Sequence, residues 1–389
     1  MERSRSLFPF VTDCLIILFG AGLILFTKDV SAAAAGAVDL CARVLLPALF
    51  PFFVLSSLCV STGLGDRVSR LAARPMERLF RLPGGCAPAV ILGLIGGYPV
   101  GARTAFELYD AGACDRESCG RLLGFCSCCG PAYLFSAVGT AIFGQLRAGL
   151  LLFVCHMLAA LAIGLISGFF AKRPDRPISR RLPRAHSANA GTFTQAVSSS
   201  FTGMLNVCAF VVFFAAAMAF LQSCGFFALC RRLFFFLPPA AADTLARGLV
   251  EMTSGVAHLA QCGLSFPGAL ALAAFLCGWG GLSVHFQVLS LRDGRDIPMS
   301  RYFWGKLFHG LLAGAMTYAG ALFFLRDAAA CAPGYVPVGT VQSPLYFILV
   351  CGVYLVITLL ASSAAVRIDE WREKRAAAKN GCNPGGKKV

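Results

Sequence analysis

The chain has 389 residues, of which 57% are hydrophobic and 14% charged, and its mean hydropathy is +0.72. This composition excludes an ordinary soluble domain and predicts a membrane protein that contacts the lipid bilayer through several spanning segments. The formal net charge of +15 does not indicate nucleic-acid binding, because the basic residues gather in short runs between apolar segments, as in cytoplasmic loops.

The 18 cysteines lie almost entirely within apolar segments, where cysteine behaves as a small hydrophobic residue. The densest group is CSCC, Cys126 to Cys129. Its spacing is too tight for the usual pair of CxxC zinc knuckles, and no histidine is near in sequence. We therefore expect neither a bound metal ion nor a cofactor.

The apolar segments predict an all-α polytopic membrane protein with about eight transmembrane helices. These segments are Val11 to Phe26, Leu40 to Thr62, Gly120 to Phe143, Arg147 to Phe170, Val197 to Gln222, Pro267 to Leu291, Tyr302 to Leu325 and Pro344 to Val366. We expect the first to be a retained helix rather than a cleaved signal peptide, and the second to kink at Pro47 and Pro51. Gly63 to Gly85 is typical of a basic amphipathic helix on the inner surface.

Two further stretches do not look like regular spanning helices. Gly93 to Gly112 contains five glycines, a proline, Arg103 and Glu107, and Asp243 to Gly263 contains Glu251. Within a bilayer, broken helix is tolerated only inside protein or around a cavity, and ionisable groups there mark a pathway or a binding site. We therefore expect both stretches to be re-entrant or broken-helix hairpins.

The positive-inside rule supports a topology in which both hairpins enter and leave on the same side. Both termini, the linker from Lys172 to Arg184 and the loop from Arg292 to Lys306 are then cytoplasmic, in a bacterial cytoplasmic membrane. The resulting plan has a first helix (1–30), a first repeat (31–171), a basic cytoplasmic linker (172–195), a second repeat (196–326), an external loop with the last helix (327–366) and a basic cytoplasmic tail (367–389).

The two repeats rest on a weak internal similarity. GLIGGYPVGARTAFELYDAG has a counterpart in GLVEMTSGVAHLAQCGLS, and LLGFCSCCGPAYLF has one in FLCGWGGLSVHFQV. The spacing agrees, since Gly93 to Gly124 is 31 residues and Gly248 to Gly278 is 30. Chance similarity of glycine-rich apolar segments is the alternative. The topology makes the repeats inverted, an arrangement in which secondary transporters build a substrate site from interrupted helices.

The candidate substrate- or ion-binding residues lie in and near the hairpins. They are Gly96, Gly97, Tyr98, Pro99, Gly101, Arg103, Glu107, Gly130, Pro131, Glu251 and His285. The glycines and prolines either break a helix or merely allow tight packing. Arg103 and Glu107 either face a cavity or pair with each other. Glu251 either couples transport to H⁺ or Na⁺ or pairs with Arg247, and His285 is a ligand or a packed core residue.

A family resemblance follows from LLPALFPFFVLSS, GGYPVGA, LLGFCSCCGPAYLF, GLVEMTSGV and GWGGLSVHFQV. In this order they resemble the YlbJ-type sporulation integral membrane proteins, across roughly residues 10 to 325. The resemblance implies a nucleoside-recognition or gate domain, similar to parts of concentrative nucleoside transporters and ferrous iron permeases, and a role in spore formation. Arg103 stands where the family often has Lys. Cys128 and Cys129 stand in place of Asn or Ser, which removes groups that could contact a polar solute.

The sequence shows no nucleophile elbow, Walker loop, HExxH motif or enzyme-type carboxylate pair, so we expect no enzyme and no catalytic residue. We expect a transporter-like protein, required for sporulation, that moves a small polar or ionic solute across the cytoplasmic or forespore membrane. The alternative is a non-transporting membrane scaffold for spore envelope or cortex assembly. Whether the protein forms a homo-oligomer is left open.

Overall fold

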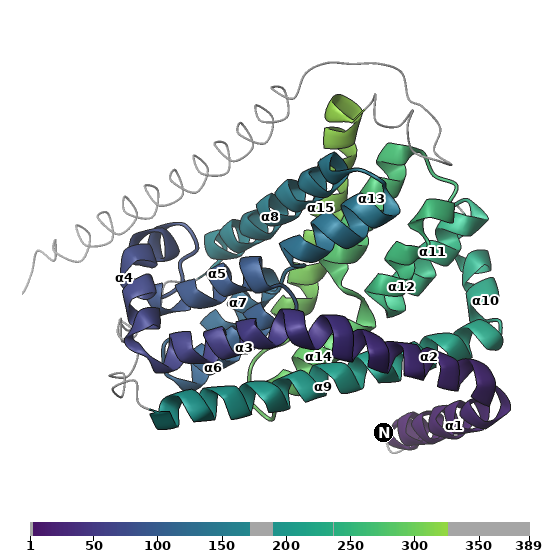
Figure 1. The fold of residues 1–389 in the computed structure, drawn as a ribbon, viewed down its shortest axis with the longest axis horizontal. Helices are drawn as coiled ribbons and strands as arrows, with labels where there is room; N and C mark the ends of the chain where they lie inside the picture. Colours follow the sequence, from purple (N-terminus) through teal and green to yellow (C-terminus); the bar gives the residue numbers. More distant parts are fainter. Residues whose placement is uncertain (1–2, 172–189, 236, 326–389) are drawn as a thin grey trace, which may run out of the picture.

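The computed structural model describes residues 3–171, 190–235 and 237–325 (Figure 1). Within these ranges the chain is helical and contains no strand, which confirms the all-α expectation. The elements up to the linker are α1 (Arg3–Leu25), α2 (Thr27–Leu40), η1 (Cys41–Leu45), α3 (Leu46–Ser61), α4 (Gly63–Arg78), η2 (Gly84–Cys86), α5 (Ala87–Gly96), α6 (Val100–Asp110), α7 (Arg116–Cys126), η3 (Tyr133–Ile142) and α8 (Leu146–Phe169). Those after it are α9 (Ala190–Ser223), α10 (Phe226–Leu233), α11 (Pro239–Val250), α12 (Met252–Ala257), η4 (Leu259–Gln261), α13 (Phe266–Trp279), α14 (Gly281–Arg292) and α15 (Ser300–Phe324).

The second helix begins earlier than the sequence suggests. α2, η1 and α3 form one uninterrupted helical rod, and the π-helical segment η1 ends two residues before Pro47. Proline has no N–H to donate to the preceding turn, so a wider turn accommodates it without ending the helix. The rod runs antiparallel to α9, because Phe26 contacts Phe220 at one end and Phe50 contacts Phe201 at the other (Figure 1).

The segment from Gly120 to Phe143 is not the continuous helix expected from its hydropathy. α7 ends at Cys126, residues 127–130 are non-helical, and the π-helix η3 begins only at Tyr133. Pro131 accounts for the interruption, because proline disfavours helical geometry in the residue before it and cannot donate a backbone hydrogen bond. Hydropathy alone does not detect this break, because every residue around it is apolar or small.

The segment from Pro267 to Leu291 is also interrupted. Gly280 adopts a left-handed conformation with φ of 89° between α13 and α14. The expected helices at Arg147 to Phe170 and Tyr302 to Leu325 are confirmed as α8 and α15.

Four helical stretches in the described ranges are long and apolar enough to cross a membrane: α8, α9, α15, and α13 with α14 taken together across the break at Gly280. The number rises to six if each of two bent pairs, α1 with α2 and α4 with α5, is one span; these pairs bend by 95° and 105°. The expected count of about eight is therefore not reached by these helices. The last expected segment, Pro344 to Val366, lies outside the described residues.

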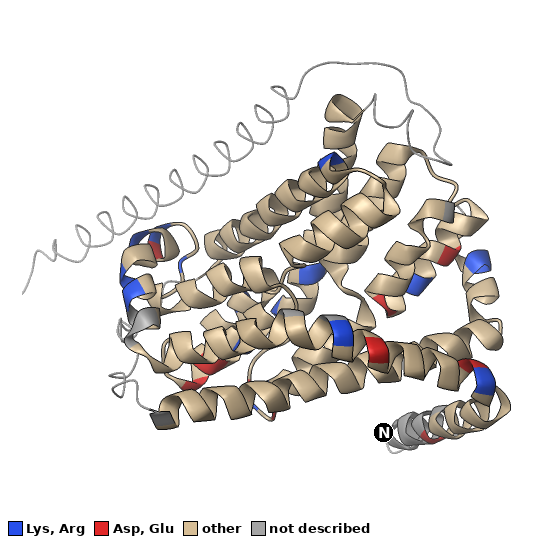
Figure 2. Cartoon of the chain, in the orientation of Figure 1, with Lys and Arg blue, Asp and Glu red and all other residues tan. Residues whose placement is uncertain are grey.

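The helices α8, α13 and α15 pack together around one of the apolar cores, and charged residues are sparser on them than on α4 (Figure 2). Outer faces expose large apolar side chains, such as Ile24 at 78% and Trp304 at 60% exposure. Exposed apolar surface of this kind fits contact with lipid. Glycines bring the central helices together: a Cβ on Gly278 would lie 2.5 Å from the Cα of Gly310.

This close approach gives a stability prediction. Gly278→Ala is expected to lower the free energy of unfolding by about 1–3 kcal/mol, the usual cost of overpacking, and to lower the melting temperature in detergent. Gly36→Ala is the matched control, since a Cβ at this position would meet no atom of a neighbouring element within 4 Å in the described ranges. There alanine should be neutral or slightly stabilising. Equal melting temperatures for the two variants would contradict the packing described for α13 and α15.

Candidate functional site

Two helix breaks in the first half of the chain touch each other. The first lies between α5 and α6 at Gly97, whose φ is 79°. The second follows α7 after Cys126. A Cβ on Gly97 would lie 2.8 Å from the backbone nitrogen of Gly130. Only glycine permits this approach together with positive φ, so the two breaks meet through their backbones.

A second pair of breaks meets in the same way. Glu251 is extended between α11 and α12, and Gly280 separates α13 from α14. The next residue, Gly281, has φ of 74°. A Cβ there would lie 3.0 Å from both the carbonyl oxygen of Gly248 and the backbone nitrogen of Met252. Four interruptions are thus arranged as two contacting pairs.

Tyr98 joins the two pairs. Its hydroxyl donates to the carbonyl oxygens of Cys277 at 2.9 Å and Gly278 at 3.3 Å. These carbonyls belong to the last turn of α13, where no further helical N–H is available to them. A side chain from the first break therefore satisfies backbone acceptors at the fourth.

Lys306 of α15 lies at this junction with no solvent exposure. Its ammonium donates to the hydroxyl of Tyr98, to the carbonyl oxygen of Ser127 at 2.8 Å and to Nδ1 of His309 at 3.2 Å. The nitrogen also lies 4.6 Å from the centre of the Tyr98 ring. Within the described residues, no carboxylate forms an ion pair with it. An uncompensated charge is costly away from water, and the described groups that contact the ammonium are neutral dipoles and an aromatic ring.

Two histidines extend this network. The rings of His156 on α8 and His309 on α15 lie 4.3 Å apart. His309 accepts from Lys306 through Nδ1, so its Nε2 carries the proton that it donates to the carbonyl oxygen of His156 at 3.0 Å. His156 accepts the backbone N–H of Cys129 through Nε2 at 2.9 Å. In neutral His156 the proton is therefore on Nδ1.

Two polar atoms of the junction have no partner in the described part of the chain. They are Nδ1 of His156 and the hydroxyl of Ser127, both fully buried. Buried polar groups are nearly always hydrogen-bonded, to protein, water or a ligand. The junction, defined here as Tyr98, Ser127, His156, Lys306 and His309, therefore has spare donors and one full positive charge.

Three side chains at the junction have the composition of a metal centre. Ligand atoms of Cys128, His156 and His309 lie within 4.8 Å of one another, and a thiolate with two imidazoles is typical of zinc or copper(I). The structure thus supplies the histidines that CSCC lacks in sequence. However, Nε2 of His156 and Nδ1 of His309 already accept hydrogen bonds, the latter from a cation. The other ring nitrogens, Nδ1 of His156 and Nε2 of His309, carry protons. Neither histidine therefore has a free lone pair for a metal ion, and the site is better suited to a ligand that accepts hydrogen bonds.

Arg103 and Glu107 pair with each other, which is one of the two interpretations of their spacing. Nε of Arg103 lies 2.9 Å from Oε1 of Glu107, and the hydroxyl of Ser56 donates to the same carboxylate at 3.0 Å. The guanidinium also lies over the ring of Phe53 at 4.8 Å and reaches the carbonyl oxygen of Ser199 at 3.4 Å. Arg103 therefore connects α6 with α3 and α9 and lies outside the junction.

Glu251 lies at the third break, where its carboxylate caps α12. It accepts the backbone N–H groups of Thr253 at 3.0 Å and Ser254 at 2.7 Å. Arg247, the partner considered from the sequence, instead pairs with Asp243 at 2.8 Å. A carboxylate at a helix N-terminus is stabilised by the helix dipole and by these N–H groups.

The remaining candidates divide between breaks and core packing. Gly97 and Gly130 lie at the contact between breaks, and Gly101 packs against the carbonyl oxygen of Cys126. His285 is buried, and its Nδ1 lies 2.9 Å from the hydroxyl of Tyr302. Gly96, Pro99 and Pro131 belong to the broken segments themselves.

Sequence reasoning does not identify Lys306, His156 or His309. It counts Lys306 both as the end of a cytoplasmic loop and as part of the helix from Tyr302 to Leu325; the structure places this residue inside α15, where it is fully buried. Its position at the start of an apolar run hides it, since a basic residue there looks like a flanking charge. The feature of the sequence that could have identified this site is the spacing of Lys306 and His309, because residues three apart lie on one face of a helix.

Tyr98→Phe tests the connection between the two pairs of breaks. In this variant the carbonyl oxygens of Cys277 and Gly278 lose their hydroxyl donor, and the ammonium of Lys306 loses one acceptor. We expect a loss of about 1–3 kcal/mol, the cost of unsatisfied buried polar groups, seen as a lower melting temperature in detergent. Tyr318→Phe is the control, because that side chain is 45% exposed on the same helix as Lys306. An unchanged melting temperature for Tyr98→Phe would contradict the bridging role.

Comparison with known proteins gives a relative. The chain is 26% identical over 295 residues to the sporulation integral membrane protein YlbJ of Bacillus subtilis (strain 168), covering 70% of this chain and 72% of that protein. No family model matches, and no solved structure does so. The similarity confirms the resemblance to the YlbJ-type sporulation integral membrane proteins that the sequence motifs indicate.

Proposed function

We propose that the protein is a transporter-like membrane protein that acts in sporulation and moves a small solute across the membrane by alternating access. The observation that carries this proposal is the buried Lys306, which has no carboxylate partner in the described ranges. It contacts the first two helix breaks through Tyr98 and Ser127, and Tyr98 connects it to the end of α13 at the fourth. In membrane proteins, broken helices and unpaired buried charges occur where a solute is bound.

The order of elements supports an inverted repeat. α3, α4, α5 with α6, α7 with η3, and α8 have counterparts in α9, α10, α11 with α12, α13 with α14, and α15. Two corresponding pairs of helices run antiparallel. α3 does so against α9, and the end of α8 at Ser167 lies beside the start of α15 at Arg301. Inverted repeats require antiparallel counterparts, and the tilted rings of His156 and His309 are a direct contact between α8 and α15.

The chemistry of the junction favours a solute that is anionic or rich in hydrogen-bond acceptors. Lys306 provides positive charge, and His156 and Ser127 provide polar atoms that have no partner in the described ranges. The carbonyl of Ser127 offsets part of the ammonium charge, but a neutral dipole does not balance a full charge in a medium of low dielectric. Glu251 remains the proposed H⁺- or Na⁺-coupling group, because it lies within a break and its carboxylate is partly accessible.

The role in sporulation follows from the name of the Bacillus relative. The proposed location is the cytoplasmic or forespore membrane, with both termini in the cytoplasm. The basic residues of α4 agree with that orientation (Figure 2).

Transport can be tested with purified protein in liposomes. Uptake of a panel of labelled solutes would be measured: phosphate, a dicarboxylate, an amino acid and a nucleoside. Lys306→Met should reduce uptake of the accepted solute at least tenfold while leaving the melting temperature measurable. Arg232→Gln is the control, because this arginine is exposed on α10.

A non-transporting scaffold predicts another result. No solute in the panel would then enter wild-type liposomes above empty ones, and Lys306→Met would leave sporulation of the host unchanged. Removal of residues 367–389 would abolish sporulation instead. That combination would replace the transporter proposal with the scaffold.

Alternating access requires the two halves to separate on one side at a time, and ion pairs connect them on one side. The guanidinium of Arg295 binds the carboxylate of Asp110 through two nitrogens, at 2.8 and 2.6 Å. Arg116 pairs with Asp296 at 2.9 Å, and this hydrogen bond holds the pKa of Asp296 below its usual range. Protonation at low pH therefore weakens this pair, whereas neutral pH retains it.

We expect these ion pairs to hold that side of the junction closed. In a cysteine-free background with Ser127→Cys, Asp110→Arg should raise the rate of labelling by an impermeant maleimide severalfold. The charge swap Asp110→Arg with Arg295→Asp should restore the slow rate, and about 1 M salt, where the Debye length is about 3 Å, should mimic the single variant. A labelling rate unaffected by all three changes would show that the pairs do not gate access.

A further inference from the structure

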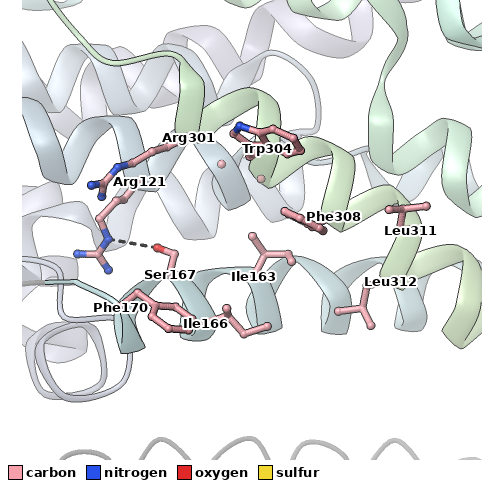
Figure 3. Close-up of a pocket in the computed structure, with 12 residues that line it drawn as sticks. Arg121, Ile163, Ile166, Ser167, Phe170, Arg301, Trp304, Phe308, Leu311 and Leu312 are labelled. Carbon is pink, nitrogen blue, oxygen red and sulfur yellow. Dashed lines mark hydrogen bonds between the residues drawn. The ribbon is translucent and has the colours of Figure 1, made fainter.

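A groove of about 700 Å³ lies between α8 and α15, and its lining includes none of the five junction residues (Figure 3). Its two long walls are α8 and α15, and its floor is formed by Gly124 of α7 and Gly305 of α15. A Cβ on Gly124 would lie 3.6 Å from the Cα of Gly305, so the backbones meet there. This volume lies within the range of small-molecule sites.

One end of the groove is basic. Arg121 and Arg301 lie together at this end, as Figure 3 shows. Arg121 is held in place: it donates to the hydroxyl of Ser167 at 3.1 Å, to the carbonyl oxygen of Arg81 at 2.9 Å and to that of Phe80. These bonds use three of its five N–H groups. The guanidinium is thus fixed at the groove with donors remaining.

The second arginine is more accessible. Arg301 pairs with Glu117, yet 45% of its side chain is exposed. Because this end holds two arginines and one glutamate, its net charge is positive. Both helix ends that meet here, the last turn of α8 and the first turn of α15, are the ends of candidate spans. The basic end is therefore at the depth of the membrane–water interface.

The rest of the groove is apolar and continues toward the middle of the two spans. Its lining includes large exposed side chains: Ile166 at 46%, Trp304 at 60%, Phe308 at 51% and Leu311 at 51% exposure. A tryptophan at the boundary between a basic and an apolar region is typical of the headgroup level of a bilayer.

From this distribution we infer that the groove is a binding site for an anionic phospholipid. The phosphate lies at Arg121 and Arg301, and one acyl chain lies along α8 and α15 against Ile166 and Phe308. The charge at one end and the length of apolar lining match the two parts of a phospholipid. Basic pockets between spanning helices bind anionic headgroups in this way, and arginine recognises phosphate through paired donors.

The experiment uses quenching of tryptophan fluorescence by lipids with brominated acyl chains, in the full chain reconstituted into liposomes. Trp304 lines the groove, and Trp304→Phe defines the signal from the other tryptophans. With brominated phosphatidylglycerol, quenching of Trp304 should reach half its maximum at about one fifth of the mole fraction needed with brominated phosphatidylcholine. A fivefold preference is the size expected when one arginine contacts the anionic headgroup.

Two variants separate charge from structure. Arg301→Gln should remove most of this fivefold preference. Glu117→Gln breaks the same ion pair but keeps the arginine, so it should retain or increase the preference. Equal quenching by both lipids in the wild type would overturn the inference. So would a loss of preference in Glu117→Gln equal to that in Arg301→Gln.

The remaining outcomes identify other occupants, and each overturns the inference. If Trp304 is quenched by neither lipid, another part of the chain covers the groove; the segment 344–366, outside the described residues, is the candidate. If about 10 mM inorganic phosphate abolishes the preference for phosphatidylglycerol, the site recognises a free anion and needs no acyl chain.

Discussion

The structure depends on one constraint: backbone groups at a helix break inside a membrane must find partners within the protein. Four breaks meet this demand collectively. Glycines allow the backbones of each pair to touch, and Tyr98 and Lys306 donate to the carbonyl groups that end α13 and α7. The network of polar groups is therefore part of what permits the fold. Any function of the junction uses groups that the architecture already requires.

This constraint explains which features can be predicted from the sequence. Composition gives the membrane class, and hydropathy gives α8 and α15 correctly because these helices are regular. The glycine-rich stretch at Gly97 and the stretch at Glu251 are recognisable as broken because they are unusual for a membrane helix. The break after Cys126 is not, because it depends on a single Gly-Pro step within an apolar run.

The site can be predicted only in part for a related reason. Tyr98 and Gly130 lie within visible motifs, but their partners come from helices far along the chain. His156 and Lys306 are single polar residues in α8 and α15, and nothing in sequence connects one to the other. Their proximity follows from antiparallel packing of the two helices. Arg103 shows the opposite case, where local spacing correctly indicates a pair with Glu107.

The two histidines occupy comparable places in their helices, but their neighbours differ. Three residues before His309 is Lys306, whereas three residues before His156 is Phe153. Only one half therefore brings a cation to the centre. In a protein whose halves exchange roles, the inward-facing and outward-facing states would then differ in free energy, because an ammonium and a phenyl ring are solvated differently. If the protein alternates between two such states, as proposed above, this asymmetry gives one of them the lower free energy without any bound solute.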